Sequence, residues 1–177
     1  MMNGHPGGTA HTRRLLELAA LPPGAKVLDM GAGAGETLAI LCAEGFDAVG
    51  IDLAPRCETV LRGDFLHTPY EDADFDAVVS QCAFFVSGDV PGALREARRI
   101  LKPGGRLLLS DVFFTEPEPL LKEAGFALLQ AEDITPAWRA YYLEALWSEA
   151  APCCELPRGK CSYWLLIGQK EEKRGSV

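Results

Sequence analysis

The sequence has no long apolar segment and no secretory signal. Its apolar runs, such as Trp164 to Ile167, are far shorter than the roughly 20 residues that cross a bilayer. The opening MMNGHPGGTAHT has no apolar core after a basic start, which a secretory signal requires. From these absences we expect a protein with no membrane partner and a cytoplasmic location.

Positive charge is scarce, because 17 lysines and arginines face 25 aspartates and glutamates. The resulting net charge of −8 argues against broad, charge-driven binding to nucleic acid, since such binding needs a basic surface. We therefore expect no nucleic-acid partner for this chain.

A disulfide framework and a metal-binding pattern are also lacking. The six cysteines are dispersed along the chain, so most are expected to be reduced thiols. Cys153, Cys154 and Cys161 do not have the spacing of a zinc site, and no histidine lies near them in the sequence. We expect no resident metal. A thiol cluster that includes Cys82 and serves substrate capture or redox control stays open as an alternative.

What the sequence does contain suits one globular core. Its 177 residues are 48% hydrophobic and 24% charged, and no internal repeat or linker separates two cores. We expect an N-terminal segment and helix over residues 1–25, one domain over 26–170, and a flexible charged tail over 171–177.

Strand-like and helix-like segments alternate along this domain. Strands are expected at residues 26–30, 47–51, 58–62, 75–80, 106–112, 126–133 and 161–170. Helices are expected at residues 12–20, 36–44, 91–101, 119–124 and 136–150. Such alternation predicts an α/β fold with a mostly parallel sheet that helices cover on both faces.

A glycine-rich turn follows the first expected strand. Residues 27–35 read VLDMGAGAG, so a buried strand feeds a turn that opens a helix. This is the context in which such a turn binds a ligand, because glycine permits positive φ and close approach of the backbone. The turn alone is weak evidence, and Asp29 could simply cap it.

Two acidic residues follow the next strands. Asp52 ends the second strand, 21 residues after Gly31, where a carboxylate can accept hydrogen bonds from two ribose hydroxyls. Asp64 and Phe65 follow the third strand. Each acid has a simpler explanation, a solvated loop acid for Asp52 and an Asx-turn for Asp64. Their joint placement at the carboxyl ends of parallel strands predicts a ligand crevice.

The spacing of the glycines disfavours a nicotinamide dinucleotide. The turn reads Gly31-x-Gly33-x-Gly35, and Glu36 stands where the third glycine of the dinucleotide fingerprint would fall. An acidic residue suits the N-terminus of a helix but would repel a pyrophosphate. A ligand without phosphate is therefore favoured.

Four stretches in this order give the chain a family resemblance: VLDMGAGAG, VGIDLAP, GDF-LHTPYEDADFDAVVS and LREARRILKPGGRLLLSD. It resembles the class I S-adenosylmethionine (SAM)-dependent methyltransferases, particularly the branch acting on small molecules and quinone precursors, over residues 27–112. The resemblance implies a Rossmann-like, doubly wound sheet of seven strands, with an antiparallel last strand, in a SAM-binding domain over 26–170. It implies an enzyme that moves the SAM methyl group to a small-molecule acceptor by in-line displacement.

The resemblance also implies residue roles. Asp29 and the glycine turn would surround the methionine and sugar portion of SAM, Asp52 would hold the ribose, and Ser80 would face the methyl group. The implied cofactor-binding residues are Asp29, Gly31, Ala32, Gly33, Gly35, Ile51, Asp52, Leu53, Asp64, Phe65 and Ser80. No catalytic base is identified, because methyl transfer from a sulfonium depends mainly on alignment.

Two features depart from the family. Only residues 53–57 separate Asp52 from the third strand, where the family usually has a helix, and Pro55 discourages one. We expect the N-terminal segment or a second subunit to cover the exposed sheet, so a homodimer is a further expectation. The glycine-rich residues 3–11, with His5 and His11, are the candidate lid. These departures leave an alternative function open, a SAM-binding partner or regulatory protein with little activity.

Overall fold

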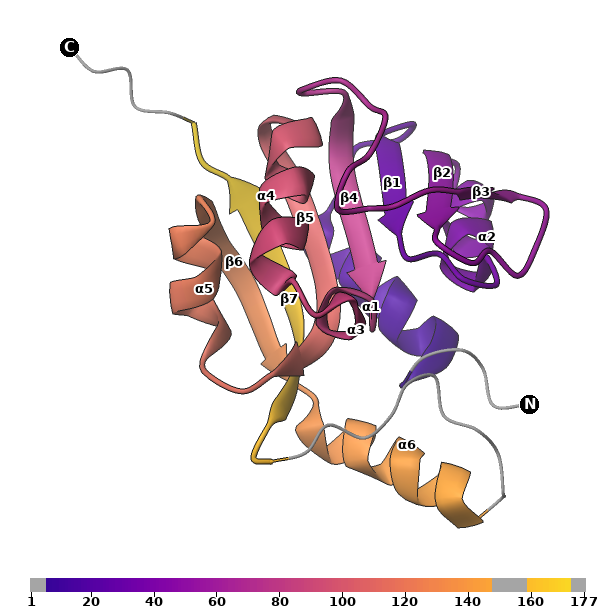
Figure 1. Cartoon of the computed structure of the whole chain (residues 1–177), viewed down its shortest axis with the longest axis vertical. Coiled ribbons are helices and arrows are strands. Elements are labelled where there is room, and N and C mark those ends of the chain that lie inside the picture. The colour runs from indigo at the N-terminus through magenta and orange to yellow at the C-terminus, as the bar shows by residue number, and fades with distance from the viewer. Residues whose placement is uncertain (1–5, 148–158, 173–177) are drawn as a thin grey trace.

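A seven-stranded sheet lies between two layers of helices (Figure 1). The computed structural model describes residues 6–147 and 159–172. The strand order is β3-β2-β1-β4-β5-β7-β6, in which β7 runs antiparallel to both β5 and β6. The ladders that join β3, β2, β1, β4 and β5 are all parallel. The expected Rossmann-like sheet with an antiparallel last strand is therefore confirmed.

The elements follow one another in the expected order. The strands are β1 (Lys26–Met30), β2 (Asp47–Asp52), β3 (Val60–Arg62), β4 (Phe75–Gln81), β5 (Leu101–Phe113), β6 (Phe126–Asp133) and β7 (Ser162–Lys170). The helices are α1 (Gly8–Ala19), α2 (Glu36–Ala43), α3 (Phe84–Ser87), α4 (Val90–Ile100), α5 (Pro117–Glu123) and α6 (Thr135–Trp147). Among the residues described, no helix is long and apolar enough to cross a membrane.

Several boundaries differ from those expected. Helix α1 begins at Gly8 rather than Thr12, because Thr12 is buried and accepts a hydrogen bond from Gln81 instead of capping the helix. Strand β3 begins at Val60, two residues later than expected, and β5 begins at Leu101, five residues earlier. Helix α3 was not predicted, since four residues are too few to show a helical period.

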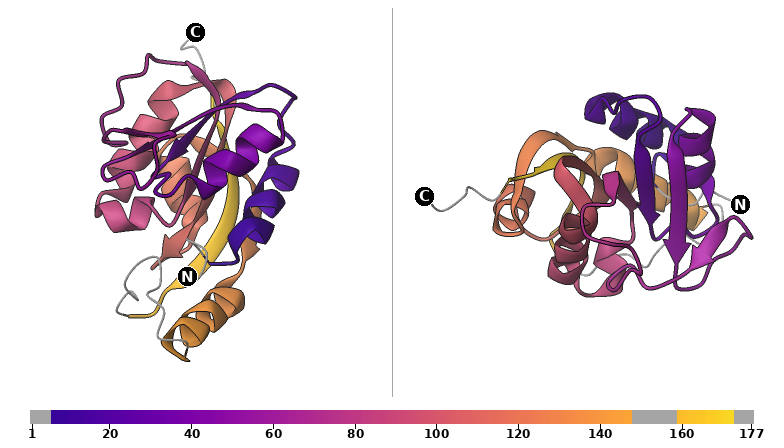
Figure 2. Two further views of the ribbon diagram at one scale, coloured as in Figure 1. Left: turned by 90° about the vertical axis from the view of Figure 1, so that its right-hand side faces the viewer. Right: turned by 90° about the horizontal axis from the view of Figure 1, so that it is seen from above.

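Alternation along the strands builds two cores, one on each face of the sheet. Leu28 and Met30 of β1 pack beneath α4 and α5, whereas Val27 packs beneath α1 and α2. The two helix layers are separated by the sheet in the side view (Figure 2). Figure 1 shows α6 beyond the end of the sheet, where Trp138 stacks on Tyr163 with ring centroids 5.7 Å apart. The helices α3 and α6 therefore lie near the carboxyl ends of the parallel strands.

The short connection between β2 and β3 has a local cover. Val60 is 4% exposed and packs with Ala32 and Leu38, with Cys57 of the connection partly buried against them. Helix α1 packs instead over β4, β5 and β7 through Leu15 and its neighbours. Within the described residues, the N-terminal segment does not cover β3: α2 and the connection bury Val60, whereas Leu61, which points to the opposite face, stays 52% exposed.

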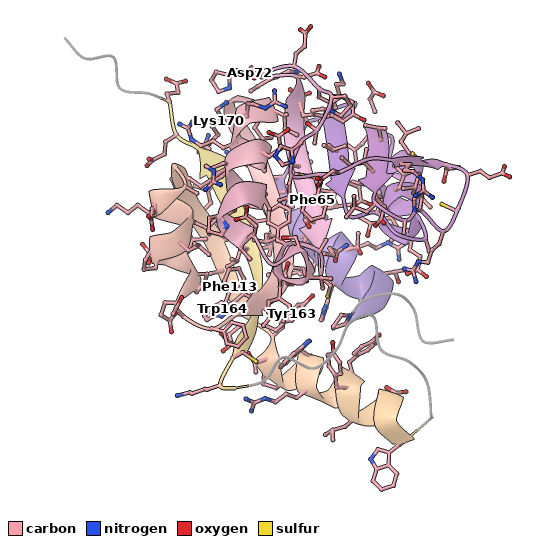
Figure 3. All side chains as sticks on the ribbon, viewed as in Figure 1. Phe65, Asp72, Phe113, Tyr163, Trp164 and Lys170 are labelled. Atoms are coloured by element: carbon pink, nitrogen blue, oxygen red, sulfur yellow. The ribbon has the colours of Figure 1, made fainter. Side chains whose placement is uncertain are left out.

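The connection from β3 to β4 contains no helix and is held to α4 by charged hydrogen bonds. Glu96 Oε1 accepts from the Thr68 backbone N–H at 2.8 Å and from its hydroxyl at 2.6 Å. Arg99 donates to Glu96 Oε1 at 2.7 Å and to Asp72 at 2.8 Å. Asp72 is labelled at the outer end of this arrangement in Figure 3. Burial acts to raise the pKa of Glu96, but the hydrogen bonds from Arg99 and Thr68 hold it below its usual range.

We expect Glu96→Ala to lower the free energy of unfolding by about 1–3 kcal/mol, because the Thr68 N–H and hydroxyl lose their acceptor. Urea unfolding followed by circular dichroism measures the change. Glu123→Ala, an exposed glutamate on α5, is the matched control and should change stability by less than about 0.5 kcal/mol. Equal stability of the two variants would contradict the proposed role of Glu96.

Candidate functional site

A cavity of about 410 Å³ lies at the carboxyl ends of β1, β2 and β4. This is the edge at which open α/β sheets bind ligands, because the loops there diverge and leave a crevice. The lining residues are Asp29, Gly31, Ala32, Gly33, Ala34, Glu36, Thr37, Asp52, Leu53, Ala54, Arg56, Asp64, Phe65, Leu66, Gln81, Cys82, Ala83, Val86 and Ser87. Eight of the eleven sequence-predicted cofactor residues are in this set.

The glycine turn forms one wall of the cavity. The backbone N–H groups of Gly31 and Ala32 both donate to the Ile51 carbonyl, at 2.9 and 3.0 Å. Gly31 has a φ of 87°, and a Cβ built on it would overlap the Cβ of Ala83, the second residue after β4. Glycine is therefore required at position 31 for both reasons, since an L side chain rarely adopts this φ and has no space.

Asp52 connects the turn to the end of β2. Its Oδ2 accepts a hydrogen bond from the Gly33 N–H at 2.9 Å, and its Oδ1 accepts from the Ala54 N–H at 2.8 Å. The Arg56 N–H in turn donates to the Gly33 carbonyl at 2.9 Å, so the short β2–β3 connection folds back over the turn. The Asp52 carboxylate is half-buried and lines the cavity between these two backbone segments.

Asp29 brings a buried carboxyl group to the same cavity. It is 2% exposed, and its Oδ2 has no hydrogen-bond partner within the described part of the chain. Burial, and then the charge of nearby Asp52, raise the pKa of Asp29 to about 7, although a hydrogen bond from the Leu38 backbone acts in the opposite direction. The group can therefore exchange a proton near neutral pH, and a cation bound beside it would favour its ionised form.

Asp64 and Phe65, which follow β3 in the chain, also line the cavity. The Asp64 Oδ1 accepts from the Leu66 N–H at 2.8 Å, which is the Asx-turn expected as its simpler explanation. Asp64 still lines the cavity, so the two explanations are compatible. The Phe65 ring packs against Phe84 with centroids 5.7 Å apart, and Figure 3 shows Phe65 beside α4.

Three of the predicted residues do not line the cavity. Ser80 is fully buried, and its hydroxyl donates to the Met30 carbonyl at 2.9 Å, so it joins β4 to β1 rather than facing a ligand. Ile51 is buried and contributes its carbonyl to the turn. Gly35 precedes α2 with a φ of 79°, and the space for its Cβ is taken by Cys57 Sγ. All three residues stabilise the cavity wall without lining the cavity.

Five of the lining residues outside the predicted cofactor set come from the end of β4 and from α3 or the residues just before it. Gln81 directly follows Ser80, and since neighbouring strand residues point to opposite sides, a shift of one position would have found it. Cys82, just after β4, is singled out in the sequence only as a member of a possible thiol cluster, and Ala83 and Val86 are missed because α3 has no sequence signature. Asp111 of β5 holds this helix in place by accepting the Phe85 N–H at 3.1 Å.

Cys82 has a backbone φ of 56°, unusual for a residue other than glycine, and its thiol is hydrogen-bonded. Its Sγ lies 2.8 Å from the Tyr163 hydroxyl, which also accepts from the Ser110 hydroxyl at 2.9 Å. Burial, and then the neighbouring Cys82, raise the pKa of Tyr163 well above its usual range. Tyr163 is therefore a neutral hydrogen-bonding group. Figure 3 labels it at the end of the sheet.

The other candidate residues lie outside the cavity or outside the described residues. His11 Nδ1 is 3.0 Å from the Pro6 carbonyl, and His11 is absent from the cavity lining. His5 of the candidate lid, and Cys153 and Cys154 of the thiol cluster, fall outside the described residues. Within residues 6–147 and 159–172, no three His, Cys, Asp or Glu side chains come together as metal ligands.

Comparison with known proteins agrees with this geometry. Residues 28–109 match a family model described as a methyltransferase domain. The chain is 36% identical over 97 residues to a demethylmenaquinone methyltransferase of Corynebacterium kroppenstedtii, covering 50% of this chain and 42% of that protein. It is 31% identical over 119 residues to an arsenite methyltransferase of Halobacterium salinarum, covering 57% of this chain and 30% of that protein.

The fold has solved counterparts. A phosphoethanolamine N-methyltransferase 2 of Haemonchus contortus, in complex with S-adenosyl-L-methionine, superposes with a TM-score of 0.74 at 18% identity, over 95% of this chain and 54% of that one. This likeness concerns the fold alone, and the chain spans less than half the length of the two curated relatives above. The matched domain, the sequence relatives and the strand order thus make this chain similar to the class I SAM-dependent methyltransferases.

Proposed function

We propose that the chain binds SAM in the cavity at the sheet edge and transfers its methyl group to a small-molecule acceptor. The observation that carries this proposal is the position of Asp52. Its carboxylate lines the cavity while accepting a hydrogen bond from Gly33, so one side chain joins the second strand, the glycine turn and the ligand space. A carboxylate at this point suits the two hydroxyls of a ribose.

The chemistry of the lining fits SAM better than a phosphate-bearing nucleotide. Asp29, Glu36, Asp52 and Asp64 give the cavity an acidic character, while Arg56 is the one cation in its lining. Acidic groups attract a ligand with positive charges and repel a pyrophosphate. When bound, SAM supplies a methyl group that its sulfonium makes electrophilic. The unpartnered Oδ2 of Asp29 is also suited to a cationic or hydrogen-bond-donating ligand.

We assign the parts of the ligand to the walls as follows. Asp52 binds the ribose hydroxyls, and Leu53 and Phe65 pack against the adenine. Asp64 accepts a hydrogen bond from the adenine amino group. Gly31 and Asp29 contact the methionine portion. These are the roles that the family resemblance implies, and the order of the lining residues from β3 through β2 to β1 is compatible with them.

The residues after β4 serve the reacting end. Ala83 and Val86 provide apolar surface there, and Asp111 holds α3 by accepting the Phe85 N–H. Alignment of two reactants contributes about 7–11 kcal/mol of barrier lowering without any proton transfer. Tyr163 cannot act as a base near neutral pH, because burial raises its pKa well above the usual range. An acceptor that enters as a nucleophile in its own right suits this site.

The cytoplasmic location, the absence of a nucleic-acid partner and the homodimer stay predictions. The net charge of −8 supports the absence of a nucleic-acid partner. Leu61 of β3, which is 52% exposed near the edge of the sheet, favours a second subunit there. Sedimentation velocity of wild type and Leu61→Lys tests the dimer, since a buried lysine would dissociate it. A monomeric wild type would contradict it.

We expect Asp52→Ala to weaken SAM binding by about 1–3 kcal/mol, because two ribose hydroxyls lose a charged acceptor. Isothermal titration with SAM measures the change. Asp47→Ala, at the opposite end of the same strand and exposed, is the matched control and should bind like wild type. Turnover assays on thiol, metalloid, phenol and carboxylate acceptors complete the test. Binding without turnover on any acceptor would favour the regulatory alternative.

Gly31→Ala should abolish detectable SAM binding, because its Cβ would overlap Ala83 and push the turn or α3 out of place. Thermal unfolding with and without SAM reports the loss. Gly24→Ala is the matched control, since Gly24 also has a positive φ, of 72°, but nothing lies within 4 Å of its Cβ position. If Gly31→Ala were still stabilised by SAM as strongly as Gly24→Ala, the turn would not be the binding wall.

The pKa of Asp29 makes stability depend on pH. Because its pKa is about 7 when folded and near 3.8 when unfolded, the folded state holds an extra proton between these values. The free energy of unfolding should therefore fall as pH rises from about 4 to 7, by up to about 4 kcal/mol. We expect Asp29→Asn to remove this slope, as urea unfolding at pH 5 and pH 8 would show. Asp47→Asn should keep the wild-type slope, and an unchanged slope in Asp29→Asn would contradict the assignment.

A further inference from the structure

Two buried acceptor atoms among the lining residues lack a hydrogen-bond partner. They are Asp29 Oδ2 and Gln81 Oε1, and within the described residues the only other such side-chain atom is Trp138 Nε1, outside the cavity lining. Leaving a buried acceptor unpaired costs about 1–3 kcal/mol. Two of them in the walls of one cavity indicate a ligand that supplies hydrogen-bond donors to both.

The orientation of the Gln81 amide is set by two helices. Its Nε2 donates to the Thr12 hydroxyl of α1 at 3.0 Å and to the Thr37 hydroxyl of α2 at 2.8 Å. Both amide hydrogens are thereby used, so the side chain can offer a ligand only its Oε1. Gln81 is 8% exposed, and Thr12 and Thr37 are also buried, which holds the amide in this orientation.

The charge of the surroundings selects the donor. The Asp29 carboxyl lines the same cavity, and its pKa of about 7 reflects burial and then the negative charge of Asp52. A cationic donor relieves both unpaired acceptors and also stabilises the ionised carboxylate. An ammonium group has three donors and no acceptor, whereas a sulfonium has no N–H or O–H to donate. Since the ribose hydroxyls are assigned to Asp52 and the adenine amino group to Asp64, the α-ammonium is the donor of SAM that remains for both atoms.

We propose that Gln81 is a cofactor-binding residue whose Oε1 accepts a hydrogen bond from the α-ammonium group of SAM, beside Asp29. This inference rests on the proposed function and adds a residue that the sequence motifs do not contain. It also gives α1 a role in binding, because Thr12 holds the amide that receives the methionine end.

The first test compares two ligands that differ only in the amino group. S-adenosylhomocysteine carries the ammonium, and its desamino analogue keeps the adenosine, thioether and carboxylate. Gln81→Leu should weaken binding of S-adenosylhomocysteine about tenfold and change binding of the analogue by less than about twofold, as measured by isothermal titration. Gln169→Leu is the matched control, because Gln169 Nε2 bonds the Gly104 carbonyl away from the cavity, and it should bind both ligands like wild type.

The second test reports which end of the amide faces the ligand. Gln81→Glu keeps the shape and leaves only acceptors, and the Thr12 and Thr37 hydroxyls can turn to donate to it. We expect this variant to bind S-adenosylhomocysteine within about threefold of wild type, or more tightly, since it adds attraction for an ammonium. Weaker binding by both Gln81→Glu and Gln81→Leu would place the amide nitrogen, not the oxygen, at the ligand and overturn the proposal.

The outcomes separate this inference from the function on which it rests. If wild type binds neither SAM nor S-adenosylhomocysteine, the proposed function fails and the inference with it. If wild type binds and Gln81→Leu weakens both ligands equally, or neither, the inference alone is overturned. Circular dichroism and thermal unfolding establish that each variant is folded. If Gln81→Leu does not fold, Gln81→Glu is titrated with the same two ligands. The proposal then requires Gln81→Glu to bind S-adenosylhomocysteine more tightly than the desamino analogue, because only the former carries the amino group.

Discussion

The hydrogen bonds between the glycine turn and the end of β2 are the constraint on which the site depends. The Ile51 carbonyl accepts from Gly31 and Ala32, and the Asp52 carboxylate accepts from Gly33. These bonds follow directly from the register that pairs Met30 with Ile51 across the two parallel strands. A slip of one residue would turn Asp52 to the other face of the sheet and separate the turn from its acceptors.

The same region carries an energetic cost that the remainder of the described chain largely avoids. Glu96, which holds the β3–β4 connection, has Arg99 and Thr68 as partners. Asp29 is more deeply buried, has an unpaired oxygen, and lies near another carboxylate. Buried polar groups are normally satisfied, and exceptions concentrate at functional sites, where a ligand completes them. The contrast between Glu96 and Asp29 therefore supports the proposed role of Asp29 in ligand binding.

The fold tolerates the missing helix between β2 and β3 because the short connection both covers the sheet and holds the glycine turn. Cys57 packs against Val60 and helps α2 to bury it, while the Arg56 N–H bonds the Gly33 carbonyl. The connection therefore both covers the sheet and braces the glycine turn. A surface left bare by the missing helix would have exposed Val60, whose burial contributes about 1.5–3 kcal/mol.

The sequence by itself determined the sheet, the glycine turn and the position of Asp52, because each depends on local rules. Hydrophobic periodicity marks the strands, positive φ requires glycine, and parallel strands bring their carboxyl ends to one edge. Only the tertiary structure decided that Gln81 rather than Ser80 lines the cavity, that α3 supplies its far wall, and that α1 stays clear of β3. These outcomes depend on contacts between distant segments, such as Gln81 with Thr12 and Ser80 with Met30, and no local pattern encodes which of two neighbouring side chains finds a partner.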